Sequence, residues 1–500
     1  TIKFDPHVIV KTIQRLKHKR SCDPNGYPVT MLKNLAGCLA YPLSLIFNSF
    51  MSTGSVPEAW KSATVTPVYK SGLSSDPGNY RPISLTSIFC KLMERIMVAE
   101  MLQYCKQNEL ISREQHGFLA KRSTTTNLLE CLNDWSSAVA NRKSVIIAYI
   151  DFKKAFDSVC HDKLFHRLSS LGFTGALLKF LRSLLVGRTQ RTRVGDCLSD
   201  PIELLSGVIQ GSCIGPLLFV LYINSLTLLH DRAVTCKLYA DDVKLYTDLT
   251  SNSGTDALQR SLDELADWAR TWQLPISISK CSVLTLNAKM GSLEHEFYLD
   301  NCRLQQLLEI KDLGITIDSQ LKFNLHIDKI VGKAQSRASL IHRCFKTGSA
   351  DILFRAFAVY VRPLLEYGSV VWSPHYKYAI EKVESVQRRF TKRLPGMSNI
   401  EYKQRLALLN VTSLEHRRLI AEQVTLYKIL FDLYDCNLKN ELVLKTNVIP
   451  TRGNPFKLET SVSHSDVDKY RFINRTATIW NTLPPSIVQF TSLAAFKRTI

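Results

Sequence analysis

The sequence predicts an α+β fold in which a mixed β-sheet backed by helices lies between two helical regions. Three observations support this. Residues 1–60 carry apolar side chains at helical spacing, short β-rich segments alternate with amphipathic stretches from Ala63 to about Ile317, and basic amphipathic stretches follow. A chain of 500 residues exceeds the range over which one core keeps growing, so several units are expected. We expect their boundaries at 1–60, 61–317, 318–400 and 401–500.

The individual elements follow from local patterns. Apolar residues recur every three or four positions from Leu32 to Phe50, after a turn signal at Asp23-Pro24-Asn25-Gly26. Val145–Ile150 is a run of six apolar residues, which predicts a strand buried on both faces. The segments with strand character are ATVTPVYK (63–70), SVIIAYIDF (144–152), CKLYADDVKLYT (236–247) and CSVLTL (281–286).

One basic helix is expected near the end of the third unit. Its apolar stripe consists of Val383, Val386, Phe390 and Leu394, and its other faces carry the i,i+4 pairs Arg388 with Lys392 and Arg389 with Arg393. From residue 321 to 400 there are 14 Lys and Arg against 5 Asp and Glu, within a chain of net charge +20. A phosphate backbone suits such a surface, and a solvated basic face is the alternative.

Composition also excludes several classes. The 13 Cys are scattered without a C-x-x-C pair, so neither a zinc ribbon nor a disulfide scaffold is indicated, and a reducing compartment is expected. The longest apolar run, around Leu217–Ile223, is too short to span a bilayer, and Thr1–Arg20 lacks the apolar region of a signal peptide. No membrane association is expected. The chain starts with Thr, so we expect a fragment of a longer polypeptide.

Carboxylates occur in two of the segments with strand character. Asp151 follows Val145–Ile150, and Asp241 and Asp242 lie in the sequence YADD. Neighbouring strand residues point to opposite faces, so only one of these two acids can share a metal with Asp151 unless a tight turn intervenes. We favour Asp241. Such carboxylates indicate a Mg²⁺ site for phosphoryl transfer, and a turn with solvated acids is the alternative.

Several ordered motifs resemble those of one family. AYIDFKKAFD (148–157), GVIQGSCIGPLLFVLYIN (207–224) and LYADD (238–242) resemble the A, B and C motifs of reverse transcriptases from non-LTR (LINE-type) retrotransposons of the jockey-like and chicken-repeat-like kind. Further similarity covers nearly the whole chain, at residues 65–97, 115–129, 274–286, 310–318, 360–374 and 471–484.

The resemblance implies a right-hand polymerase with fingers, a palm that contains an antiparallel sheet, and a helical thumb at 318–400. Helical N- and C-terminal extensions would flank it. The implied activity is RNA-directed DNA synthesis from a primer 3′-hydroxyl, which by analogy is nicked target DNA. Partners would be template RNA, primer or target DNA and dNTPs, with Mg²⁺ or alternatively Mn²⁺ as cofactor. The nucleus is the expected place of action by the same analogy, and the oligomeric state is left open.

The resemblance also assigns residues. The metal-binding and catalytic triad would be Asp151, Asp241 and Asp242, and the primer grip Leu313 and Gly314. Independently of the resemblance, the basic helix described above would provide nucleic-acid contacts through Arg388, Arg389, Lys392 and Arg393. The nucleotide-binding set would be Lys70, Arg81, Phe152, Phe156, Gln210, Gly211 and Lys280.

Within the nucleotide-binding set, the roles differ. Phe156 would reject a ribose 2′-hydroxyl, or is simply a core residue. Lys70 and Arg81 would neutralise the triphosphate, or are surface cations. Gln210 and Gly211 would line the nucleotide pocket. Lys280 would protonate pyrophosphate, or is a surface lysine.

Some positions depart from the family pattern, namely Ile209 for Pro, Ser225 for Asp, Leu119-Ala120 for an Arg-containing pair, and Cys160 for Pro. None removes a metal ligand. Two alternatives remain, a catalytically silent RNA-binding remnant, and a maturase-like reverse transcriptase or RNA-templated RNA polymerase. The retained acids and Arg81 disfavour the first, and Phe156 disfavours RNA synthesis. We expect no endonuclease within these 500 residues.

Overall fold

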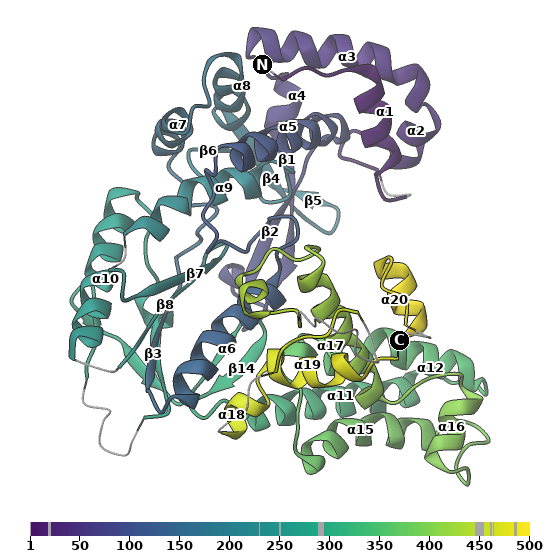
Figure 1. Cartoon of the computed structure of the whole chain (residues 1–500). Coiled ribbons are helices and arrows are strands. Elements are labelled where there is room, and N and C mark those ends of the chain that lie inside the picture. The colour runs from purple at the N-terminus through teal and green to yellow at the C-terminus, as the bar shows by residue number, and fades with distance from the viewer. Residues whose placement is uncertain are drawn as a thin grey trace.

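The computed structural model describes residues 2–18, 22–229, 231–249, 252–288, 295–445, 455–460, 463, 465–484 and 488–500. The N-terminal region is helical, as its apolar spacing predicts, and lies at the top of Figure 1. Its helices are α1 (Pro6–Gln14), α2 (Val29–Asn34), α3 (Ala36–Thr53) and α4 (Glu58–Lys61). They pack beside α5 (Ile88–Gln107) and α8 (Gly175–Leu185), with α7 (His161–Ser170) next to α8.

A first sheet follows the N-terminal helices. Its strands are β1 (Ser62–Tyr69), β2 (Tyr80–Leu85), β4 (Arg188–Val194), β5 (Cys197–Leu198) and β6 (Ile202–Leu204). The order is β2-β1-β4-β5, and β6 also pairs with β4. Strand β1 is antiparallel to β2 and parallel to β4. The sheet therefore joins residues near position 65 to residues near position 190.

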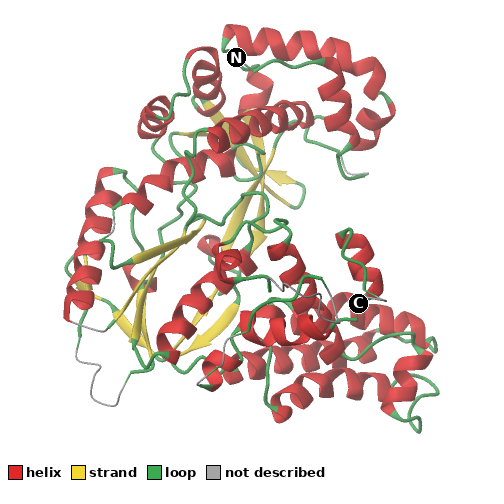
Figure 2. Ribbon diagram, in the orientation of Figure 1, coloured by secondary structure: helices red, strands yellow, loops and turns green. Residues whose placement is uncertain are grey.

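A second, five-stranded sheet forms the centre of the molecule and has the order β12-β9-β3-β8-β7 (Figure 2). Its strands are β3 (Val145–Ile150), β7 (Thr235–Tyr239), β8 (Asp242–Asp248), β9 (Ser282–Leu286) and β12 (Gln305–Leu307). Neighbours are antiparallel except β12 and β9, so the expected antiparallel sheet is confirmed with one parallel edge pair. Helix α6 (Thr124–Ala140) lies on one side, and α10 (Asn252–Thr271) lies on the other side (Figure 1).

Strand β3 separates two hydrophobic cores. Ile146, Ala148 and Ile150 belong to the core that also contains the N-terminal helices, α9 (Gly215–Ile223) and α10. Val145, Ile147 and Tyr149 belong to the core that contains α6 and the C-terminal helices. All six side chains are buried, which confirms the prediction of a strand covered on both faces. The residue that ends this strand, Asp151, is therefore held by a rigid support.

Two short hairpins lie outside the five-stranded sheet. They consist of β10 (Tyr298–Leu299) with β11 (Cys302–Arg303), and of β13 (Glu309–Asp312) with β14 (Ile315–Asp318). Short 3₁₀ helices complete the connections: η1 (Pro77–Asn79), η2 (Asn224–Leu228), η3 (Ile278–Lys280) and η4 (Asn437–Glu441). Within the described residues, no strand longer than an isolated bridge follows β14.

The C-terminal region is a helical bundle at the lower right of Figure 1. Its helices are α11 (Asn324–Cys344), α12 (Ala350–Tyr360), α13 (Arg362–Glu366), α14 (Ser369–Trp372), α15 (Lys377–Lys392), α16 (Tyr402–Leu408), α17 (Leu414–Leu430), α18 (Asp466–Lys469), α19 (Phe472–Thr482) and α20 (Leu493–Thr499). The expected basic helix is α15, and its apolar stripe is buried as predicted. Among the helices that the structure describes, none has the length and apolarity needed to cross a membrane.

Candidate active site

A tight turn carries the paired acids of the YADD sequence. Tyr239 pairs with Asp242, so Ala240 and Asp241 are the two central residues of the β7–β8 hairpin. Ala240 has φ +58°, while Asp241 is not among the positive-φ residues, as in a type II′ turn. This acidic turn, residues 239–242, is the tight turn that allows both acids to face the region of Asp151.

Asp151 lies beside the acidic turn because β3 and β8 are neighbours. Ile150 is opposite Val243, so Asp151 and Asp242 are the next residues on the two antiparallel strands. The main chain of Asp151 is fixed on both sides. Its N–H donates to Cys281 Sγ at 3.4 Å, and its carbonyl accepts from the N–H of Ser277 at 2.7 Å. The carboxylate remains 42% exposed and accessible to a ligand.

Burial and neighbouring negative charge raise the pKa values of Asp241 and Asp242. Burial and then the negative charge of Asp151 raise the pKa of Asp241, while Lys70 and Arg81 lower it. Burial of the carboxyl group and the charge of Asp241 raise the pKa of Asp242 to about 6, although part of that side chain is exposed to solvent. Repulsion of this kind is relieved when a cation binds between the carboxylates.

Hard carboxylate oxygens suit hard divalent cations such as Mg²⁺. The donor set of Asp151, Asp241 and Asp242 therefore fits a metal site in its chemistry. Within the part of the chain that the structure describes, however, no three His, Cys, Asp or Glu side chains have the geometry of a formed metal site.

Three cations from separate segments interact electrostatically with the acids. Lys70 directly follows β1, and Arg81 lies on β2 opposite Val68. Both side chains are exposed, and neither forms an ion pair with a described residue. Lys280, at the end of η3, places its Nζ 3.8 Å from Asp151 Oδ2. Lys70 and Arg81 are thus within electrostatic range of Asp241, and Lys280 lies beside Asp151.

The two phenylalanines after Asp151 occupy different environments. The Phe156 ring stacks on the buried Phe219 ring, with 4.2 Å between centroids, and remains partly exposed. The Phe152 ring is 3% exposed and packs edge-on against Trp268. Consecutive residues point to opposite sides, so the Phe152 ring points into the core, and the assignment of Phe152 to the nucleotide-binding set stays a prediction.

The segment of the B-like motif is locked to the first sheet. The Gln210 carbonyl accepts from the N–H of Ser84 on β2 at 2.7 Å, and its side-chain amide donates to Asp157 Oδ1 at 2.8 Å. Gly211 has φ +113°, and a Cβ there would lie 2.5 Å from the Ser84 carbonyl oxygen. Glycine is therefore required at 211, and Gln210 is fixed beside the strand that carries Arg81.

Leu313 and Gly314 form the two-residue turn between β13 and β14, closed by the pair Asp312 and Ile315. Both have positive φ, +44° and +91°, as in a type I′ hairpin turn. The Tyr367 hydroxyl donates to the Leu313 carbonyl at 2.8 Å, and a Cβ on Gly314 would lie 2.9 Å from the Tyr367 ring. The C-terminal bundle thus holds this turn through Tyr367.

The basic residues of α15 lie elsewhere. Arg388, Arg389, Lys392 and Arg393 are exposed in the C-terminal bundle and are not brought to the carboxylates. The Arg388 guanidinium lies over the Tyr402 ring at 5.3 Å. These cations form a separate surface.

Sequence reasoning missed the contacts that support the acidic turn. Gln115 Oε1 accepts from the N–H of Gly117 at 2.7 Å and from the N–H of Ala240 at 2.9 Å. A Cβ on Gly117 would lie 2.4 Å from the Ala240 nitrogen, so the two main chains are in direct contact. The motif at 115–129 contains both residues, but no local signal shows that they meet a turn about 125 positions away.

The departures from the family pattern fit the structure. Ile209 is buried in the core, and the Ser225 hydroxyl accepts from Trp268 Nε1 at 3.0 Å. Cys160 is the N-cap residue of α7, and Leu119-Ala120 lies in the loop before α6. None of the four sites displaces an acid.

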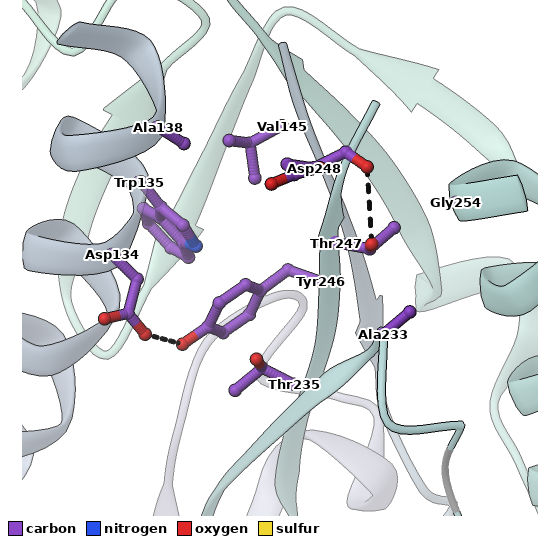
Figure 3. A pocket seen from close by; sticks show the side chains of 10 residues that line it. All are labelled: Asp134, Trp135, Ala138, Val145, Ala233, Thr235, Tyr246, Thr247, Asp248 and Gly254. Carbon is purple, nitrogen blue, oxygen red and sulfur yellow. Dashed lines mark hydrogen bonds between the residues drawn. The ribbon is translucent and has the colours of Figure 1, made fainter. Parts of the chain in front are cut away.

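A cavity of about 390 Å³ lies at the opposite end of the central sheet (Figure 3). Val145 at the start of β3 and Asp248 at the end of β8 line it, together with Trp135. Tyr246 donates its hydroxyl hydrogen to Asp134 at its edge. Because the acids stand at the other ends of these strands, this cavity is separate from the candidate active site.

Comparisons with known proteins show which family the chain resembles. The family described as reverse transcriptase (RNA-dependent DNA polymerase) matches residues 68–317. From Drosophila melanogaster, the RNA-directed DNA polymerase from mobile element jockey is 29% identical over 71% of this chain and 40% of its own length. The probable RNA-directed DNA polymerase from transposon BS is 29% identical over 76% of this chain and 43% of its own length. The probable RNA-directed DNA polymerase from transposon X-element is 23% identical over 79% of this chain and 44% of its own length. The chain therefore spans less than half the length of these relatives.

Among solved structures, an apo telomerase from Candida tropicalis, truncated from its C-terminal domain, has a TM-score of 0.38. It is 10% identical and covers 57% of this chain and 59% of its own, a likeness too low to support an inference about the site. The sequence matches confirm the resemblance to proteins of non-LTR retrotransposons, and the family match confirms the expected fold. The family in general uses divalent metal ions. The match over residues 68–317 shows that the chain belongs to the reverse transcriptase family.

Proposed function

We propose that this chain is an RNA-directed DNA polymerase that copies the RNA of a non-LTR retrotransposon from a primer 3′-hydroxyl. One observation carries the proposal. Asp151 follows β3, which is buried on both faces, and Asp241 lies in the turn before the neighbouring strand β8, within electrostatic reach of Lys70 and Arg81. Nucleotidyl transfer requires carboxylates that bind divalent metal ions and basic side chains that bind the triphosphate.

Asp151, Asp241 and Asp242 would hold Mg²⁺, with Mn²⁺ as an alternative. When bound, such ions lower the pKa of the primer hydroxyl and neutralise charge on the reacting phosphate. The acids need a rigid base for this task, and the doubly buried β3 and the tight acidic turn supply it.

The remaining residues would bind and orient the nucleotide. Lys70 and Arg81 would pair with the triphosphate, since both are exposed beside Asp241. The Phe156 ring, which stacks on Phe219, would exclude a nucleotide that carries a 2′-hydroxyl. Gln210 and Gly211 would line the pocket, and Lys280 would donate a proton to pyrophosphate near Asp151.

The rest of the chain would grip the nucleic acids. We propose fingers and palm at 61–317 and a thumb at 318–400, between N-terminal (1–60) and C-terminal (401–500) helical regions. The turn at Leu313 and Gly314 would hold the primer end. Arg388, Arg389, Lys392 and Arg393 would contact phosphates of the template RNA and primer DNA, because all four are exposed cations on one helix and its C-cap.

Primer extension tests the proposal. Purified protein is given dNTPs and Mg²⁺ with primed homopolymer RNA or DNA templates. We expect incorporation on RNA, loss of incorporation in Asp241→Asn, and salt-sensitive RNA binding that survives this change. Asp256→Asn is the control, because Asp256 is an exposed acid on α10. Full activity of Asp241→Asn would reject the assigned site, and RNA binding without extension by the unaltered protein would identify an RNA-binding remnant.

A further inference from the structure

Two lysines lie buried on one face of the central sheet, next to the acidic turn. Lys237 on β7 and Lys244 on β8 are directly opposite each other, and they are 2% and 1% exposed. Buried ammonium groups require partners. Lys237 Nζ contacts Glu130 at 2.6 Å and also pairs with Glu114. Lys244 Nζ contacts Asp312 at 2.8 Å and Asn127 Oδ1 at 2.7 Å.

The two lysines connect the sheet to different parts of the molecule. Glu130 lies on α6, which covers the sheet. Asp312 is the last residue of β13 and directly precedes the turn formed by Leu313 and Gly314. Lys244 is two residues after Asp242 on β8, so both side chains are on the same face of that strand. One buried contact therefore links the strand of Asp242 to the 313–314 turn.

The buried Ile315 and Ile317 of the β13–β14 hairpin belong to the core that also contains Tyr149, Leu284 and Leu286 of the sheet. The hairpin forms a separate two-stranded unit, without ladder pairing to the five-stranded sheet in the described part of the chain. Its base is tied to β9 through the N–H of Asn287, which donates to the Ser319 carbonyl at 3.1 Å. At the other end of the hairpin, Lys244 and Asp312 add an ion pair with the sheet, and Tyr367 donates a hydrogen bond from the C-terminal bundle.

We propose that the Lys244–Asp312 ion pair is a positioning device, which sets the 313–314 turn at a fixed distance from the catalytic acids. This inference rests on the proposed primer-holding role of that turn. A primer end held by the turn reaches the acids only if the hairpin keeps a fixed position relative to the sheet. Misplacement of reacting groups by about 1 Å can slow a reaction roughly 100-fold. Lys244 and Asp312 then position the primer terminus through the 313–314 turn, whereas Lys237 holds α6 against the sheet.

The test compares two double variants. Lys244→Met with Asp312→Leu removes the first pair, and Lys237→Met with Glu130→Gln removes the matched pair on the same face. Replacing both members of a buried ion pair by neutral groups of similar size is often tolerated in stability. Single-turnover extension on a primed RNA template gives the rate constant and the dNTP Kd. Hydrogen exchange gives the protection of residues 309–318 without requiring activity.

For the Lys244–Asp312 variant we expect a rate constant lower by about 100-fold, a dNTP Kd within about twofold of the unaltered protein, and faster exchange at residues 309–318. For the Lys237–Glu130 variant we expect a rate constant within about threefold of the unaltered protein and unchanged exchange at residues 309–318. We expect this even if its thermal stability falls as much as that of the Lys244–Asp312 variant. If the Lys244–Asp312 variant does not fold, Asp312→Asn is measured against the same thresholds.

A Lys244–Asp312 variant as fast as the Lys237–Glu130 variant would overturn the inference. If the unaltered protein extends no primer, the proposed function fails. The exchange experiment then decides the inference separately, because unchanged protection at 309–318 shows that the ion pair does not hold the hairpin.

Discussion

Gly117→Ala places a methyl group against the main chain of the acidic turn. An added Cβ would lie 2.4 Å from the Ala240 nitrogen and 3.0 Å from both Ala240 Cα and Gln115 Oε1, whereas ordinary contacts begin near 3.4 Å. Gly117 is not among the positive-φ residues, so alanine adopts its backbone conformation without strain. Main-chain atoms cannot rotate away as a side chain can. The acidic turn must therefore recede by about 1 Å.

Asp241 is the residue after Ala240 and moves with it. A displacement of about 1 Å costs roughly 100-fold in rate, which is about 2.7 kcal/mol of transition-state stabilisation. The hydrogen bond from Ala240 to Gln115 is stretched as well, and this lowers the free energy of unfolding by about 1 kcal/mol. Affinity for primer and template is expected to change less than twofold, because the exposed cations of α15 belong to the C-terminal bundle and not to the acidic turn.

The assay is single-turnover primer extension on an RNA template, with binding measured by fluorescence anisotropy and folding by circular dichroism. Gly332→Ala on α11 is the control, because no atom lies within 4 Å of its added Cβ. That variant should extend primers normally and gain about 0.4–1 kcal/mol in stability. If folded Gly117→Ala extends primers within threefold of the unaltered rate, the inferred contact does not support the acidic turn.

Three further changes test separate parts of the site. Phe156→Val should increase the use of ribonucleotides relative to deoxynucleotides by roughly 10- to 100-fold, because it removes the ring that would clash with a 2′-hydroxyl; unchanged sugar selection assigns the ring to the core alone. Arg81→Ala should raise the KM for dNTP about tenfold through loss of a charge-assisted hydrogen bond, and a KM equal to that of the exposed-cation control Arg113→Ala would leave Arg81 without a role in nucleotide binding. Glu130→Gln tests the pH dependence of stability. Burial alone would raise the pKa of Glu130, but His116 and Lys237 lower it to about 2, so the carboxylate stabilises the fold above the unfolded value of about 4.3. That stabilisation, on the order of 3 kcal/mol, is lost as the pH falls from about 5 to about 2, and equal acid unfolding of the variant and the unaltered protein would contradict it.

Patterns that depend on neighbours in the sequence predicted much of the fold. The six apolar residues before Asp151 indicated a strand covered on both faces, and β3 does face two cores. The stripe from Val383 to Leu394 indicated the buried side of α15, whose residues are buried. The first prediction succeeds because a strand buried on both faces needs apolar side chains at every position, and the second because one buried helix face imposes a period of 3.6.

Contacts between distant segments could not be predicted in this way. Gln115 and Ala240 meet because the segment after α5 runs beside β7, and no local period encodes that pairing. Lys244 lies in an alternating strand, where a charged residue ordinarily indicates the solvent face, but Asp312 and Asn127 compensate its burial. Similarly, the resemblance assigned both Phe152 and Phe156 to the nucleotide pocket, and only the structure shows that the Phe152 ring faces the core.

The position of a bound divalent ion is the most direct measurement. Crystals are grown with a primed RNA template, a chain-terminated primer, dNTP and Mn²⁺, and the anomalous signal of manganese is mapped. We expect a peak with carboxylate oxygens of Asp151 and Asp241 within about 2.0–2.6 Å, and its loss in Asp241→Asn. A manganese ion bound beside the nucleotide but away from both carboxylates would show that these acids do not form the catalytic metal site.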